Sequence, residues 1–441
     1  MKWKSIGRAA LATGMSLGIG LGATACSRDY TVAYVYATSA QTGTISAFAV
    51  DYQSGALTQI TGSPFQGTGT TPVAIVPSPN GKYIYVVNNF TSAIGVYAVG
   101  TDGKLYGQAT TSLSPVVNGT VIPGGSLPTA ATIDSTGSFL YVTFTLQPGY
   151  TTASPGKGGV TIFPINQTNG LLGTPVQNNG LYYVPVGNNP VSIAVSEPIC
   201  YTTAPAQQVT LNASCNSGTG HYAVYAYVLD QETAPNAAIL GFSQNMTTGS
   251  LALLSGASCT TTANVLCTGY AAGVRPSSVV VEPTTRYVYA ADEASNQIYG
   301  YQIANNTTGN LTGLRSSPSI SGLYPVNLTV DPRGKFLLSA NQNSNTVGSY
   351  AINSADGSLG GVAGAGAATV ATAPTCVAIE PALGIYVYTS NSLDGSISGL
   401  QMNPSTGALT TIPNSPFPTT TLPSCVTAVA NGSHASSVVN P

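Results

Sequence analysis

One group of charged residues in the sequence has the side-chain types that acid–base chemistry requires. Arg275 stands just before a predicted strand, and Asp292 and Glu293 stand at the end of the next one. A carboxylate can take and return a proton, and an arginine can hold a developing negative charge. These three residues are the catalytic candidates of the chain. The alternative interpretation is an ion pair that only closes a loop.

Further polar residues stand in the loops that lead into predicted first strands or between second and third strands, and an asparagine recurs at the end of the second strand. The ligand-binding candidates among them are Asn88, Tyr324, Asn341, Asn391 and Asp394. An asparagine at a strand end often bonds its own loop backbone instead, which is the alternative role. The two histidines, His221 and His434, lie on no predicted inner strand. No metal-ligand spacing, Ser-His-Asp arrangement or phosphate-binding loop is present, so we expect no metal and no cofactor.

A repeat of short strands must position these residues. Pro276, Pro325, Pro374 and Pro423 follow one another at intervals of 49 residues. After each of the first three come an apolar strand, a turn, an aromatic strand, a third strand, a Gly-x-Leu turn and a weak last strand. A period of this size with four short strands is typical of a β-propeller blade.

The same opening proline occurs earlier in the chain and predicts seven blades. Pro72, Pro128 and Pro190 open three further units, whereas the first strands of the chain have no such opener and Pro423 has no blade after it. We therefore expect an all-β, seven-bladed β-propeller over residues 31–430, with four antiparallel strands per blade. The C-terminal strand should complete blade one and remove the exposed sheet edges.

Cysteines at matching positions predict where the ring is cross-linked. Cys376 and Cys425 both stand two residues after an opening proline, so neighbouring inner strands can bring them within disulfide range. Two unpaired small residues are the alternative. The other predicted pairs, each nearest in sequence, are Cys200 with Cys215 and Cys259 with Cys267.

The N-terminus has the pattern of an export signal. Lys2, Lys4 and Arg8 precede an apolar run, and Cys26 follows Ala23-Thr24-Ala25. This resembles a bacterial lipobox and predicts a signal peptide over residues 1–25 and lipidation of Cys26. Residues 26–30 would link the anchor to the ring, and residues 431–441 would be a flexible tail. An ordinary signal peptide with an incidental cysteine is the alternative.

The amino-acid composition limits the classes of partner that the protein can bind. Charged residues make up only 6 % of the chain, the net charge is −2, and no basic stripe is present, which argues against nucleic acid. No segment other than the leader is long and apolar enough to span a bilayer. We therefore expect membrane attachment by the lipid anchor alone, with an envelope protein or glycan as the partner.

The repeats resemble a known family. Pro325-Val-Asn-Leu-Thr-Val-Asp-Pro-Arg-Gly-Lys-Phe336 and the second strands Tyr83-Ile-Tyr-Val-Val-Asn88 and Tyr386-Val-Tyr-Thr-Ser-Asn391 look like the lactonase-type propellers with Tyr-Val-Thr-Asn repeats. The resemblance implies hydrolysis of sugar lactones such as 6-phosphogluconolactone by His, Arg and Glu at the channel mouth. No histidine here matches that pattern. Our leading hypothesis is therefore a lipid-anchored binding or scaffold module outside the cytoplasm, and the alternative is a periplasmic lactonase.

Overall fold

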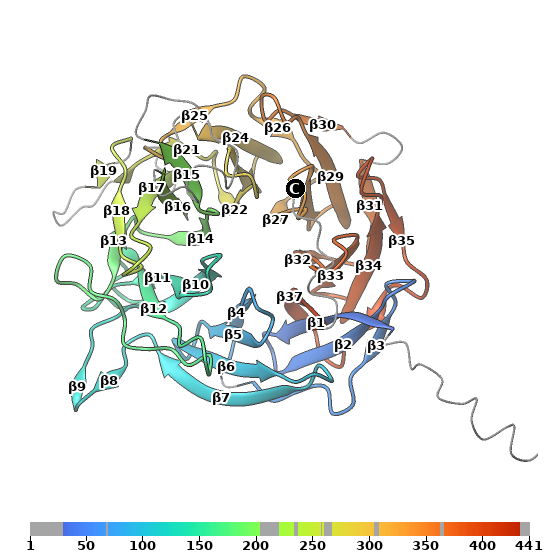
Figure 1. Cartoon of the computed structure of the whole chain (residues 1–441), viewed down its shortest axis with the longest axis horizontal. Helices are drawn as coiled ribbons and strands as arrows, with labels where there is room; N and C mark the ends of the chain where they lie inside the picture. The colour runs from blue at the N-terminus through green and yellow to red at the C-terminus, as the bar shows by residue number, and fades with distance from the viewer. Residues whose placement is uncertain are drawn as a thin grey trace, which may run out of the picture.

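The computed structural model describes residues 30–67, 69–202, 220–232, 237–256, 258–259, 267–303, 308–361 and 366–432. In this part of the chain the regular elements are all strands, and they form seven blades around a central opening (Figure 1). The predicted seven-bladed β-propeller is confirmed. No described segment forms a helix with the length and hydropathy that a membrane crossing needs.

Each blade has an inner strand at the central opening and three more strands outward from it. The inner strands of blades one to seven are β37 (Pro423–Ala430), β4 (Pro72–Pro77), β10 (Ser126–Ile133), β14 (Pro190–Val195), β22 (Pro276–Val281), β27 (Pro325–Val330) and β32 (Pro374–Ile379). The second strands are β1 (Thr31–Ser39), β5 (Tyr83–Asn88), β11 (Phe139–Leu146), β16 (Gly220–Asp230), β23 (Tyr287–Asp292), β28 (Phe336–Asn341) and β33 (Tyr386–Asn391). Alternating apolar residues and turn-forming Gly and Pro between them account for these short strands.

The outer strands follow in the same order. The third strands are β2 (Ile45–Asp51), β6 (Ala93–Val99), β12 (Gly158–Pro164), β17 (Ala238–Gln244), β24 (Gln297–Ile303), β29 (Thr346–Ile352) and β34 (Ser396–Met402). The fourth strands are β3 (Leu57–Gln59), β7 (Leu105–Ser112), β13 (Val184–Val186), β18 (Leu251–Leu253), β25 (Leu311–Gly313), β30 (Leu359–Gly361) and β35 (Leu409–Thr411).

Several blades have a short extra strand that the repeat does not predict. In blades four to seven the chain returns along the third strand after the fourth has ended, as β21 (Tyr270–Ala271), β26 (Ser319–Ile320), β31 (Ala367–Thr369) and β36 (Phe417–Pro418). The fourth strand covers only one half of the third strand, so the returning segment pairs with the other half. Blade four also contains β15 (Ile199–Thr202), and two small ribbons are β8 (Val116–Val117) with β9 (Thr120–Val121) and β19 (Ser258–Cys259) with β20 (Cys267–Thr268).

The ring is closed by the last strand, as the sequence predicts. β37 pairs antiparallel with β1, placing Tyr36 opposite Thr427 and Ala33 opposite Ala430. The hydroxyls of Thr38 and Ser424 lie 3.0 Å apart across this pair. Blade one is therefore built from both ends of the described chain.

A repeated contact between a tyrosine and a glycine joins each blade to the next. The second tyrosine of the aromatic strand donates its hydroxyl to the carbonyl of the turn glycine in the following blade, at 2.6–3.0 Å in six of the seven joints. The pairs are Tyr36–Gly103, Tyr85–Gly170, Tyr141–Gly249, Tyr227–Gly309, Tyr289–Gly357 and Tyr388–Gly55. Between blades six and seven Leu338 takes the tyrosine position, and Ser349 donates to Gly407 instead, at 2.8 Å.

The first aromatic residue of the same strand explains why the turn residue is glycine. A Cβ added at Gly55 would lie 2.4 Å from Tyr386 Cδ1, and a Cβ added at the equivalent glycine of each other blade would lie 2.3–2.4 Å from the corresponding ring. These glycines also have positive φ, for example +71° at Gly55, which other residues adopt at a cost. The aromatic strand and the Gly-x-Leu turn thus form one contact between blades.

The inner strands of blades four to seven are linked in series through the residue two after the opening proline. Ser192, Ser278 and Asn327 each accept a hydrogen bond from a backbone N–H of the next inner strand, at 3.0–3.1 Å. At the last joint Cys376 and Cys425 form a disulfide, with Cα atoms 5.0 Å apart. This predicted pair is confirmed, and it covalently joins blade seven to the closing strand.

Several features predicted for the chain ends and for blade four involve residues outside the described part of the chain. Cys200 is disulfide-bonded, and its predicted partner Cys215 lies outside the described residues. The ribbon β19–β20 places Cys259 opposite Cys267 in register. The predicted leader, Cys26 and His434 all lie outside the described residues.

Candidate functional site

The candidate residues lie on one face of the ring, which we call the top face. It carries the loops that lead into the inner strands and the loops between second and third strands. The opposite, bottom face carries the turns between first and second strands and between third and fourth strands. Arg275 stands in the loop before β22, Glu293 follows β23, and Tyr324 stands directly before β27, so blades five and six place the three residues together.

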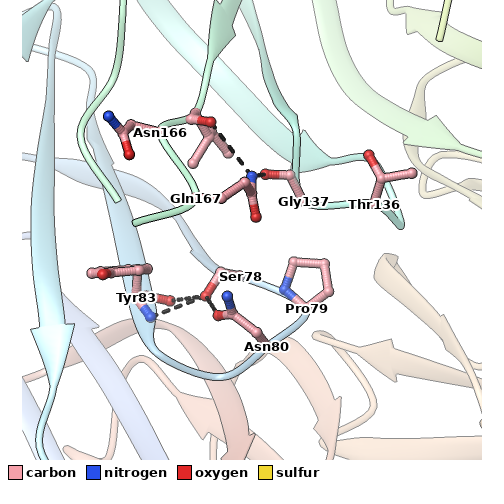
Figure 2. Close-up of a pocket in the computed structure, with 9 residues that line it drawn as sticks. Ser78, Pro79, Asn80, Tyr83, Thr136, Gly137, Asn166 and Gln167 are labelled. Carbon is pink, nitrogen blue, oxygen red and sulfur yellow. Dashed lines mark hydrogen bonds between the residues drawn. The ribbon is translucent and has the colours of Figure 1, made fainter. Parts of the chain in front are cut away.

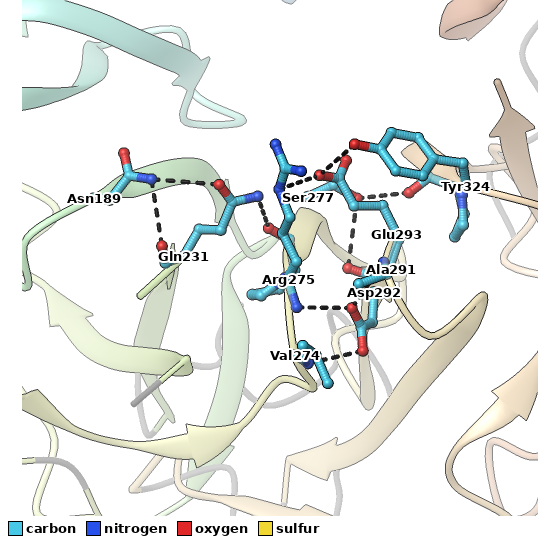
Figure 3. Close-up of polar contacts among 12 residues, drawn as sticks. Asn189, Gln231, Val274, Arg275, Ser277, Ala291, Asp292, Glu293 and Tyr324 are labelled. Atoms are coloured by element: carbon cyan, nitrogen blue, oxygen red, sulfur yellow. Dashed lines mark hydrogen bonds and ion pairs between the residues drawn. The ribbon is translucent and has the colours of Figure 1, made fainter. Parts of the chain in front are cut away.

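Glu293 is the centre of this cluster (Figure 3). Its Oε1 lies 2.7 Å from Arg275 Nε and accepts a hydrogen bond from the Tyr324 hydroxyl at 3.2 Å. The Glu293 side chain is only 8 % exposed, whereas the Arg275 side chain is 57 % exposed. The buried carboxylate is therefore oriented by two partners, and the guanidinium remains accessible from solvent.

Asp292, the third catalytic candidate, has a different role. Its two carboxylate oxygens accept hydrogen bonds from the backbone N–H groups of Val274 and Arg275, each at 2.9 Å. Asp292 is fully buried. A Cβ at Gly273, where φ is +98°, would lie 2.2 Å from Asp292 Oδ2, so the loop passes directly over this carboxylate. Asp292 thus fixes the loop that presents Arg275.

The backbone of Tyr324 is also held in an uncommon conformation. Its φ is +59°, which is unfavourable for a residue with a bulky side chain. The Asn296 side chain compensates by accepting the Tyr324 N–H at 2.7 Å. The same conformation occurs at Thr71, Leu127 and Ala373, which also directly precede opening prolines, so it is a feature of the repeat. Here the conformation accompanies the contact of the ring with Glu293.

The polar cluster continues into blade four through residues that the sequence did not indicate. Gln231 donates to the Pro276 carbonyl at 2.8 Å and accepts from Asn189 at 3.3 Å (Figure 3). Asp230, which is buried, accepts the Asn189 N–H at 2.8 Å. Asp230 occupies the place in blade four that Asp292 has in blade five, because each pairs with the opening proline of its blade. Aligning blade four despite its insertion could have identified it.

Burial sets the electrostatics of these acids. It raises the pKa of the Glu293 carboxyl, while the Arg275 guanidinium and the Tyr324 hydroxyl act in the opposite direction. Burial also raises the pKa of Asp230, and the neighbouring Glu232 carboxylate adds to the effect. A carboxylate with a raised pKa is a stronger base than an ordinary one, which suits proton transfer.

The other ligand-binding candidates mainly serve their own loops. Asn88, Asn341 and Asn391 are buried, and their side-chain amides donate to the strands on either side of the loops that follow them: Asn88 to Val86 O, Asn341 to Thr346 Oγ1 and Asn391 to Ser396 Oγ. Asp394 is exposed and accepts the Thr372 N–H. The structure therefore brings only Tyr324 of this set together with Arg275 and Glu293.

The described side chains of this cluster include no histidine. Among the described residues no group of three or more His, Cys, Asp and Glu side chains could hold a metal ion. The backbone of His221 lies in β16, where it pairs with Tyr201 of β15 at the bottom end of blade four. The described functional groups of the cluster are a carboxylate, a guanidinium and a phenol.

The closed seven-bladed ring places the chain in the class of β-propellers, and the polar cluster lies on its top face. The profile of the family described as "Lactonase, 7-bladed beta-propeller" matches residues 24–143 and 220–379, which is more than half of the chain. The chain therefore belongs to the lactonase family of seven-bladed β-propellers. No protein with curated annotation matches it.

Solved structures share the fold at low sequence identity. The periplasmic gluconolactonase PpgL of Pseudomonas aeruginosa is 16 % identical, with a TM-score of 0.62 over 91 % of this chain and 99 % of that chain. A candidate 6-phosphogluconolactonase from Bacteroides fragilis is 15 % identical, with a TM-score of 0.59 over 91 % and 99 %. A second candidate, from Bacteroides uniformis, is 16 % identical, with a TM-score of 0.59 over 90 % and 100 %.

Proposed function

We propose that the protein hydrolyses lactones at the top face, with Glu293 as the base and Arg275 as the cation that binds the carbonyl oxygen. The observation that carries the proposal is the contact of a buried carboxylate with an exposed guanidinium and a phenol. Membership of the lactonase family and the similarity to a gluconolactonase support it. They favour this activity over a role as a scaffold or binding module alone.

The arrangement is suited to each step of ester hydrolysis. Glu293 Oε2, which has no hydrogen bond among the described residues, takes a proton from water as the water oxygen attacks the lactone carbonyl carbon. The negative charge that develops on the carbonyl oxygen is stabilised by the terminal N–H groups of Arg275. The ring C–O bond then breaks, and the leaving oxygen takes the proton back from the Glu293 carboxyl, which gives the hydroxy acid and restores the base. Tyr324 keeps the Glu293 carboxylate in place.

Activity against uncharged aldonolactones tests this function. Wild-type protein should hydrolyse glucono-1,5-lactone, and Arg275→Ala should lower kcat/KM by about 10–100-fold, since removal of one such donor weakens the stabilisation of the oxyanion. Arg315→Ala is the matched control, because Arg315 is an exposed arginine on another loop of blade five. A wild-type protein without lactonase activity on a broad lactone panel, or equal loss in both variants, would contradict the proposal.

The pH dependence provides a second test. The base is the ionised form of Glu293, whose pKa is raised by burial, so kcat/KM should increase with pH through a value above the ordinary 4.5 of a glutamate. Arg275→Gln removes the cation that opposes this shift. The acidic limb of that variant should therefore move to still higher pH, and a limb that stays in place or moves down would exclude Glu293 as the titrating base.

We also propose that the protein works outside the cytoplasm, attached through Cys26. The charged and apolar leader and the periplasmic location of the similar gluconolactonase support this. Mass spectrometry of the mature N-terminus tests it. A lipid-modified Cys26 is the expected result, and an unmodified N-terminus after Ala25 would support export without an anchor.

A further inference from the structure

A second polar hollow lies on the bottom face, between blades two and three, away from the candidate active site. It has a volume of about 280 Å³. It is formed by Ser78, Pro79, Asn80, Tyr83, Thr136, Gly137, Ile165, Asn166 and Gln167. Figure 2 shows Ser78, Asn80 and Tyr83 of blade two on one side of it and Asn166 and Gln167 of blade three on the other.

The joint between blades six and seven shows how the same space is filled by an arginine. Between blades six and seven, Arg333 crosses the joint and donates to the carbonyls of Leu383 and Gly384 at 2.6 and 2.9 Å. Asn80 occupies the position of Arg333 in blade two, eight residues after the opening proline, and its side chain is too short to cross. The equivalent glycine carbonyl, that of Gly137, is bonded by Gln167 instead. The volume that an arginine occupies elsewhere is therefore left empty here.

In each of the three amide side chains around this pocket, one of the two polar atoms has a hydrogen-bond partner in the protein. Asn80 Oδ1 accepts from Ser78 Oγ at 2.8 Å and from the Lys82 N–H at 3.0 Å. Asn166 Oδ1 accepts the Thr168 N–H at 2.9 Å. Gln167 Nε2 donates to Gly137 O. These bonds determine the orientation of each amide, because only oxygen accepts and only nitrogen donates.

The other ends of the same amides have no hydrogen bond among the described residues, and they belong to the exposed side chains of Asn80, Asn166 and Gln167. They are two donors, Asn80 Nδ2 and Asn166 Nδ2, and one acceptor, Gln167 Oε1. Pro79, Tyr83 and Ile165 add apolar surface, and no charged side chain lines the pocket. A ligand that fits this lining is uncharged, has several hydroxyl groups that both donate and accept, and has an apolar C–H face.

We infer that this pocket binds one unit of an uncharged saccharide. Its volume is close to the lower limit of about 300 Å³ for small-molecule sites, which suits a single sugar ring. A charged sugar would bring an ionised group to a lining that offers it no counter-charge. The inference is independent of the proposed lactonase activity, since the two sites lie on opposite faces.

Saturation-transfer NMR on the full-length protein, with glucose, mannose and N-acetylglucosamine as probes and glucuronate as the charged comparison, tests the inference. At least one neutral sugar should show transfer at millimolar concentration, and glucuronate should not. Asn80→Arg should fill the pocket as Arg333 fills its own joint and reduce binding at least tenfold. Lys82→Ala is the control, because Lys82 is exposed and lies next to the pocket without lining it.

A second, smaller substitution keeps the inference testable if the Asn80→Arg variant fails to fold. Asn166→Ala removes one donor without adding bulk and should weaken binding by about 2–10-fold, the usual effect of one lost hydrogen bond. Thermal melting checks that each variant is folded, and lactone hydrolysis at the top face should be unchanged in all of them. Absence of transfer from every neutral sugar, or binding to folded Asn80→Arg equal to that of the wild type, would overturn the inference.

Discussion

Replacing Gly55 by alanine should lower the free energy of unfolding by about 2–5 kcal/mol, as the sum of a left-handed backbone cost and a steric overlap. Gly55 has a φ of +71°, and the added Cβ would lie 2.4 Å from Tyr386 Cδ1. The same glycine accepts the Tyr388 hydroxyl at 2.6 Å, so any displacement of the turn also strains that hydrogen bond. Because Gly55 is in blade one and both tyrosines are in blade seven, the substitution weakens the joint that closes the ring.

Gly119→Ala is the matched control for this experiment. Gly119 has a φ of +78°, but a Cβ there would meet no atom within 4 Å. It therefore reports the backbone cost alone, about 1–2 kcal/mol. Urea unfolding of both variants gives the two values. Equal destabilisation by the two substitutions would show that the ring of Tyr386 moves aside without cost and that the tyrosine–glycine contact does not hold the blades together.

Removal of the Cys376–Cys425 disulfide should cost about 4 kcal/mol in the chain-entropy description of a closed loop of this length. The two cysteines are 49 residues apart, so the bond closes a loop that contains the whole of blade seven. In the variant with both cysteines replaced by serine, no covalent bond joins the closing strand to blade seven, and β37 is held by its pairing with β1 and by the packing of Val426 and Ala428. The midpoint of urea unfolding should fall, and the amides of β37 should exchange with solvent faster than those of β27.

The double serine variant is preferable to chemical reduction of the wild type. Reduction would also cleave the disulfide of Cys200, so the loss of stability could not be assigned to the closing joint. Reduction of the double variant then serves as the control for that second bond. If the double variant unfolds at the same urea concentration as the wild type, the pairing and packing of β37 alone are sufficient to close the ring.

Much of the fold could be predicted because each blade repeats its own local pattern. The opening prolines, the alternating inner strands and the spare strand at Pro423 are all local features, and together they predict seven blades and the Cys376–Cys425 bond. The tyrosine–glycine contact was not predicted, although both of its halves are visible in the sequence. Its partners belong to neighbouring blades and are 67 residues apart for Tyr36 and Gly103, so spacing within one repeat does not connect them.

The candidate site was predictable only in part, for a similar reason. Arg275 and Glu293 flank the inner and second strands of one regular blade, so the repeat places them together. Asp230 and Gln231 follow the insertion in blade four, which hides their equivalence to Asp292 and Glu293. The sequence could not separate Asp292 from Glu293 either, because adjacent residues at a strand end point in different directions. Only the structure assigns one to the loop backbone and the other to Arg275.

The pairing of β1 with β37 also determines when a newly made chain can finish folding. Thr38 and Ser424 are 386 residues apart, so β1 has no inner neighbour until almost the whole chain has left the ribosome. An unpaired strand edge is a template for association with other chains, and such distant contacts form slowly. The edge of β1 therefore stays open to pairing with other chains until the final strand is available.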